Sequence, residues 1–162
     1  LHLVRDALPE AHDRPRVIGV GNAWRRDDGV GPALARRCGG LCTSDPAELL
    51  DLWEGAHWAI VVDAAASGAP PGTIHRFDAT AAPLPAGSTR SSTHAFGVAD
   101  AVELARALDR LPTRLEVLAV EGADFTIGTG LSTAVDRAVD ALADALSGAG
   151  PGARPRAAAP PR

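Results

Sequence analysis

Three short, mostly apolar runs constrain the fold of this chain more than any other feature. They cover Arg16–Val20 and residues 58–63 and 114–120, with the sequences RVIGV, WAIVVD and RLEVLAV. Apolar runs that do not alternate with polar residues are typical of strands buried on both faces of a parallel sheet. We therefore expect three central strands, with helices covering both faces of the sheet.

Helical patterns alternate with these runs. Apolar side chains recur at helical spacing over residues 29–37, 45–53, 98–108 and 132–146. A short strand is expected at 41–44, and the alternating segment 73–78 reads as an edge or antiparallel strand. The predicted fold class is α/β: a three-layer sandwich with a twisted, mostly parallel sheet of about five strands and helices on both faces.

Two of the expected helices carry capping signals. Asp45 precedes Pro46 and Glu48, which predicts an N-cap, a proline in the first turn and a capping-box glutamate. Ser132 can cap the last helix.

The length of 162 residues predicts one domain, because a domain typically has about 150 residues. Residues 16–147 carry the periodic patterns and are expected to form it. Residues 1–15 are polar and interrupted by proline, so we expect a loose lead-in. Residues 148–162 have no large apolar side chain, which predicts a disordered tail.

Charge and hydropathy indicate the kinds of partner and the cellular compartment to expect. The net charge of −4 gives no sign of a nucleic-acid partner. No apolar run approaches the roughly 20 residues of a membrane span, and the N-terminal residues do not resemble a signal peptide. With two cysteines, Cys38 and Cys42, expected to be reduced thiols, we predict a cytoplasmic protein without a membrane partner.

All 16 basic residues apart from histidine are arginine, and the missing lysines exclude several activities. No P-loop or Schiff-base chemistry is available. An acidic pair after the first strand is also typical of phosphorelay receiver domains. That class is excluded because its site needs a lysine, which this chain lacks. A dinucleotide fingerprint fails as well, because Trp24 stands where Gly19-x-Gly21 would need its third glycine.

In open α/β sheets, ligands bind beyond the carboxyl ends of the strands. Three candidate side chains are expected there: Asp28 after the first strand, Asp63 at the end of the 58–63 run, and His94 in the long loop 79–96. Together they would form an open metal site, whose oxygen and nitrogen donors suit Ni, Zn, Mn or Fe.

Simpler roles remain open for the same residues. Asp27 or Asp28 could cap the first helix, Asp63 could bind neighbouring loops, and His94 could be exposed or capping. Asn22 suits either a turn or a hydrogen bond in the cleft. His75 is expected to pack rather than react.

At this point the motifs resemble those of one family, the hydrogenase maturation proteases. These endopeptidases trim the C-terminus of the large subunit of [NiFe] hydrogenases. Residues 22–31 (NAWRRDDGVG), together with Gly21 before them, match the family's G-N-x-x-x-x-D-[DE]-G-x-G signature. The other matching segments are 61–64 (VVDA), 71–73 (PGT), 92–97 (STHAFG), 120–122 (VEG) and 130–132 (GLS).

The resemblance implies that Asp28, Asp63 and His94 are the metal-binding and catalytic positions. It implies a nickel-dependent processing endopeptidase, often classed as aspartic-type, that acts on the large-subunit precursor. We expect the chain to be a monomer. The nickel would be carried by the substrate, and cleavage would remove the C-terminal extension after nickel insertion. Two readings of the chemical step stay open: a water polarised by the metal, or an Asp acting as general base.

Two alternatives differ in function class. The chain could bind the metallated subunit without cleaving it, or act as a metal-dependent hydrolase of a small substrate. The chain also departs from the family pattern between residues 36 and 45, where the connection is short. We expect either a stunted second strand or a sheet that lacks one edge.

Overall fold

The structure is a computed structural model that describes residues 14–90 and 95–148. The predicted lead-in and tail lie outside the described residues, except for residues 14, 15 and 148, and so does His94. Within the described part of the chain, every helix is too short or too polar to cross a membrane.

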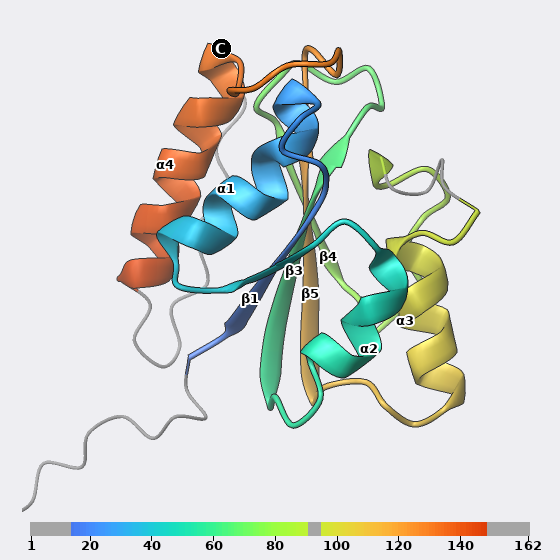
Figure 1. Cartoon of the computed structure of the whole chain (residues 1–162). Helices are drawn as coiled ribbons and strands as arrows, with labels where there is room; N and C mark the ends of the chain where they lie inside the picture. Colours follow the sequence, from blue (N-terminus) through green and yellow to red (C-terminus); the bar gives the residue numbers. More distant parts are fainter. Residues whose placement is uncertain (1–13, 91–94, 149–162) are drawn as a thin grey trace, which may run out of the picture.

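Five strands form one sheet in the order β2-β1-β3-β5-β4 (Figure 1). The strands are β1 (Arg16–Val20), β2 (Leu41–Thr43), β3 (Trp58–Ala65), β4 (Ile74–Asp78) and β5 (Arg114–Glu121). All neighbours are parallel except β4, which pairs antiparallel with β5 at the edge. The three apolar runs are the three central strands, which confirms the predicted α/β class.

Helices cover both faces of the sheet (Figure 1). One face carries α1 (Val30–Arg37) and α4 (Thr133–Ser147), and the other carries α2 (Leu49–Leu52) and α3 (Val98–Ala107). Single turns of 3₁₀ helix, η2 (Arg26–Gly29) and η3 (Pro46–Glu48), lead into α1 and α2. The result is the predicted three-layer sandwich.

Strand β3 divides its side chains between two cores. Trp58, Ile60, Val62 and Ala64 pack in the core with α1 and α4. Ala59 and Val61 pack in the core with α2 and α3. Because side chains alternate along a strand, Asp63 belongs to the α2 and α3 side.

The short connection after α1 gives a stunted edge strand rather than a sheet without an edge. Three residues of β2 pair with β1, from Leu41 opposite Ile18 to Thr43 opposite Val20. Gly40 lets the chain turn closely under β1, because a Cβ there would lie 2.3 Å from the carbonyl oxygen of Val17.

The predicted helix caps are only partly right. Asp45 does cap its helix, since its Oδ1 accepts a hydrogen bond from the Ala47 N–H at 2.9 Å. Glu48 does not complete a capping box: the Asp45 N–H donates to Thr43 Oγ1 instead, and the Thr43 hydroxyl donates to Glu48. Ser132 is the N-cap residue of α4 but makes no side-chain cap, because its hydroxyl donates to Asp27.

The carboxylate of Asp27 joins three segments. It is fully buried and accepts hydrogen bonds from the N–H groups of Ala123 (2.8 Å), Asp124 (3.0 Å) and Ser132 (2.7 Å), and from the Ser132 hydroxyl (2.8 Å). Burial alone would raise the pKa of Asp27, but these hydrogen bonds outweigh it and hold the pKa below its usual value. The turn after β1 is thereby fixed to the loop after β5 and to the start of α4.

We expect Asp27→Asn to destabilise the fold by about 3 kcal/mol, because the amide NH₂ would face buried N–H donors. Urea unfolding followed by circular dichroism measures this. Asp140→Asn is the control, because Asp140 is paired with Arg37 on the exposed surface, with 56% of its side chain accessible. It should change the free energy of unfolding little.

The stability from Asp27 should also depend on pH. A carboxylate whose pKa is lowered by folding stabilises the protein above its unfolded-state pKa of about 3.9, and that contribution is lost as the pH falls through the lower folded-state value. The gap between wild type and Asp27→Asn should therefore be complete at neutral pH and narrow in acid. A gap that stays constant down to the acid transition would contradict an ionised Asp27.

Candidate functional site

The candidate site lies where β1, β3 and β5 end, at the top of Figure 1. The turn η2 follows β1 and contacts β3. Glycine permits this close packing: a Cβ on Gly31 would lie 2.4 Å from the Val62 carbonyl oxygen, and one on Gly19 would lie 2.1 Å from that of Gly31. The loop that carries Asp28 is therefore pressed against the strand that carries Asp63.

Asp28 is anchored on both carboxylate oxygens. Its Oδ2 accepts a hydrogen bond from the Asn22 N–H at 3.0 Å, and its Oδ1 lies 3.4 Å from Arg90 Nε. The side chain is 14% exposed. Neither η2 nor α1 receives a side-chain cap, so the capping role considered for Asp27 and Asp28 does not occur.

Asn22 has a turn role. Its Oδ1 accepts a hydrogen bond from the Trp24 N–H at 2.9 Å, and its own backbone N–H serves Asp28. Asn22 therefore orients the carboxylate through the main chain and not through its amide group.

Asp63 lies deeper than Asp28. It is 1% exposed, and its Oδ1 accepts a hydrogen bond from the Ala64 N–H at 2.8 Å. Within residues 14–90 and 95–148, no three His, Cys, Asp or Glu side chains form a metal-binding group. The predicted triad has only two described members, Asp28 and Asp63, whose oxygen donors suit nickel among other metals.

Two residues beside Asp28 were not predicted from the sequence. The guanidinium of Arg90 lies over the ring of Phe125, with its Cζ 3.9 Å from the centroid, while its Nε faces Asp28. The only sequence signal was that Arg90 is the sole arginine in the long loop 79–96.

A second buried carboxylate, Glu121, supports the same edge. It is 1% exposed and accepts hydrogen bonds from the N–H groups of Ser67 (2.5 Å) and Gly68 (2.9 Å). The Nε2 of His75 lies 3.3 Å from the other carboxylate oxygen. Glu121 thus ties the loop after β3 to the edge strand β4, and His75 has a partner within the scaffold.

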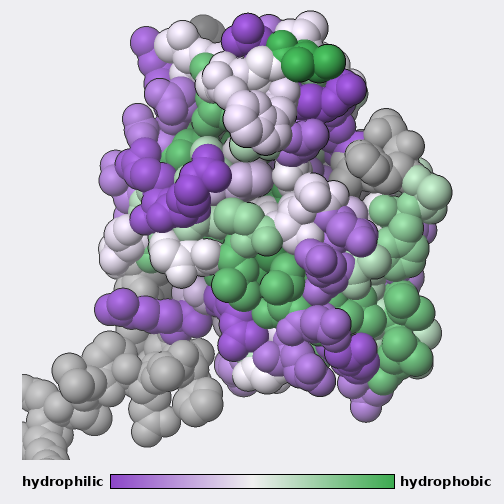
Figure 2. Space-filling model, in the orientation of Figure 1, coloured by the Kyte–Doolittle hydropathy of each residue, from purple (hydrophilic) through white to green (hydrophobic). Residues whose placement is uncertain are grey.

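Two large apolar side chains are exposed next to this site. Trp24 is 71% exposed and Ile127 is 81% exposed. Their loops are joined by the Gly128 N–H donating to the Trp24 carbonyl (2.9 Å) and the Arg26 N–H donating to the Gly128 carbonyl (3.1 Å). Figure 2 shows apolar surface at the top of the view, over the loop that follows β5.

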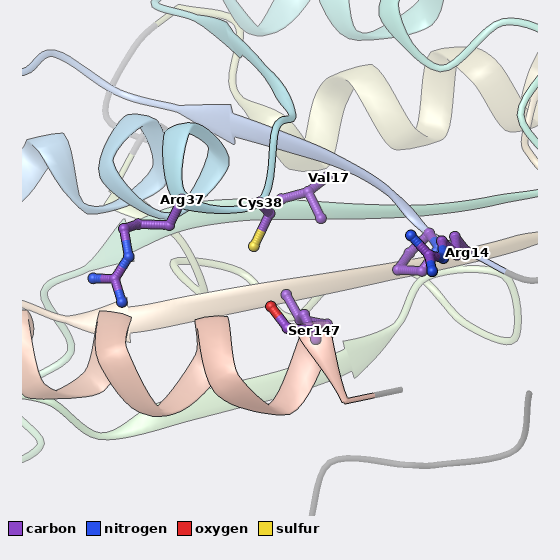
Figure 3. Close-up of a pocket in the computed structure, with 7 residues that line it drawn as sticks. Arg14, Val17, Arg37, Cys38 and Ser147 are labelled. Atoms are coloured by element: carbon purple, nitrogen blue, oxygen red, sulfur yellow. The ribbon is translucent and has the colours of Figure 1, made fainter. Parts of the chain in front are cut away.

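A separate cavity of about 230 Å³ lies at the opposite edge, where β1 begins and where α1 and α4 end (Figure 3). Arg14, Val17, Arg37, Cys38 and Ser147 are among its lining residues. Burial raises the pKa of the Cys38 thiol, and the Arg37 charge lowers it in part. Both cysteines are free, as predicted.

Comparison with solved structures places the fold. The hydrogenase maturating endopeptidase HybD from Escherichia coli is similar with 21% identity and a TM-score of 0.67, over 81% of this chain and 88% of that one. The [NiFe] hydrogenase maturation protease HybD from Thermococcus kodakarensis is similar with 22% identity and a TM-score of 0.65, over 81% and 95%. At these identities the likeness shows a shared fold.

A comparison with curated protein sequences found no match. A family model described as hydrogenase maturation protease matches residues 43–149, which is more than half of the chain. The matched range includes Asp63 and His94, and Asp28 precedes it. The chain therefore belongs to the hydrogenase maturation protease family.

Proposed function

We propose that this chain is an endopeptidase that removes the C-terminal extension of a [NiFe] hydrogenase large-subunit precursor after nickel insertion. Family membership supports the reaction class. The observation that carries the site assignment is the placement of Asp28 and Asp63 by adjoining segments at one edge of the sheet. We propose His94, which lies within the range matched by the family model, as the third member of the set.

In this proposal the nickel belongs to the substrate. Carboxylate and imidazole groups are acceptable donors to it. The nucleophile is then either a water polarised by that nickel or a water deprotonated by a carboxylate acting as general base. In both cases Asp28 is the described carboxylate nearer to solvent, with 14% of its side chain exposed against 1% for Asp63.

The surface around Asp28 favours a protein substrate over a small molecule. Trp24 and Ile127 are held apart from the core on two hydrogen-bonded loops, at a cost in hydration free energy. Large apolar side chains presented in this way are typical of protein contacts. Their position next to Asp28 suits a polypeptide that lies across the site.

We expect Asp28→Asn, Asp63→Asn and His94→Ala each to slow precursor trimming by roughly 100-fold or more, because each removes a proposed ligand or base. Mass spectrometry of a purified, nickel-loaded precursor measures loss of the C-terminal peptide. Asp51→Asn is the matched control, an exposed carboxylate on α2 that pairs with Arg110 and is 83% accessible. Normal trimming by all three site variants would overturn the assignment.

Two further measurements test the nickel requirement and distinguish cleavage from binding alone. A nickel-free precursor should stay uncut by the wild-type chain, which tests the nickel requirement. A nickel-loaded precursor that forms a stable complex by gel filtration but keeps its full mass would instead support a recognition module without catalysis.

We expect Trp24→Ala and Ile127→Ala each to raise KM for the precursor about tenfold with kcat nearly unchanged, because the lost contacts are binding contacts. Leu108→Ala is the control, since Leu108 is 54% exposed but follows α3. An equal rise in KM for the control, or none for either loop variant, would argue against docking at Trp24 and Ile127.

A further inference from the structure

Asp28 already faces a cation that belongs to the chain itself. Arg90 Nε lies 3.4 Å from Asp28 Oδ1, and the two side chains are only 27% and 14% exposed. A partly desolvated ion pair is screened less by water and salt than a pair on the open surface. The Asp28 oxygen that faces Arg90 is not the oxygen bound by the Asn22 N–H.

The guanidinium is held in this place from a second side. Its Cζ lies 3.9 Å above the centroid of the Phe125 ring, a distance suited to a cation–π contact. The ring packs over Gly122, where a Cβ would lie 2.5 Å from the Phe125 Cζ. The turn just before Phe125 is fixed by the Asp27 carboxylate through Ala123 and Asp124. The ring that Arg90 packs against is therefore itself held in place.

We propose that Arg90 is a positioning residue for Asp28. It occupies the place beside the carboxylate that a metal cation would take. The site therefore selects metal delivered by a docked protein over free metal ions. This inference rests on the proposed function. Two cations cannot share Asp28 Oδ1 without strong repulsion, so a metal ion must displace Arg90 to reach that oxygen. A free metal ion has only its own binding free energy to break the Arg90–Asp28 pair. For a metal held inside a docked protein, the free energy of docking also helps to displace Arg90.

Calorimetric titration of the full-length chain with Ni²⁺ alone tests this. We expect Arg90→Met to bind Ni²⁺ about tenfold more tightly than wild type, because the competing charge is gone while an unbranched side chain still packs on Phe125. Arg25→Met is the matched control. Arg25 is exposed on the same loop as Asp28, so this change removes one positive charge from the same region.

The double variant Asp28→Asn with Arg90→Met should bind Ni²⁺ no more tightly than Asp28→Asn alone, because the gain depends on that carboxylate. The proposal is overturned if Arg90→Met leaves the affinity unchanged, if Arg25→Met raises it equally, or if the gain survives in the double variant. Since the titration uses the chain without precursor, these outcomes are independent of whether the chain cleaves a hydrogenase subunit.

Discussion

The buried carboxylate of Asp27 is the interaction on which the rest of this edge depends. Four hydrogen bonds converge on it from the loop after β5 and from the start of α4. Its ionised form is favoured by those donors despite burial. It is the buried anchor between the turn that carries Asp28 and the turn that carries Phe125, which backbone hydrogen bonds of Gly128 also join. Because Phe125 in turn supports Arg90, the electrostatic surroundings of Asp28 are set by its own neighbour in sequence.

The adjacent aspartates therefore divide two tasks. Asp27 points into the protein, satisfies buried N–H groups and is fully inaccessible. Asp28 keeps partial exposure and faces the guanidinium of Arg90 as well as a backbone N–H group. A single carboxylate could not do both, since a group committed to four donors has little capacity left for a ligand.

The central strands could be predicted because the mostly apolar runs that became β3 and β5 are typical of strands buried on both faces of a sheet. Asp63 followed from its place in such a run. The roles of Asp27 and Asp28 could not be separated, because the donors to Asp27 lie about a hundred residues away in sequence. The prediction that Ser132 caps the last helix was wrong for the same reason, because its hydroxyl donates a hydrogen bond to Asp27. Arg90 lies in a segment without periodicity, where local patterns carry no information about contacts.

Because side chains alternate along β3, the orientation of Asp63 depends on its number of positions from the other residues of the strand. Asp63 emerges on the α2 and α3 side because it lies five positions after Trp58, and an odd offset along a strand places two side chains on opposite faces. Conservative substitutions within the strand keep that parity, whereas loss or gain of one residue would turn the carboxylate to the opposite layer. Homologous chains that retain this chemistry should therefore vary freely in the loops around β3 but keep the spacing within it unchanged.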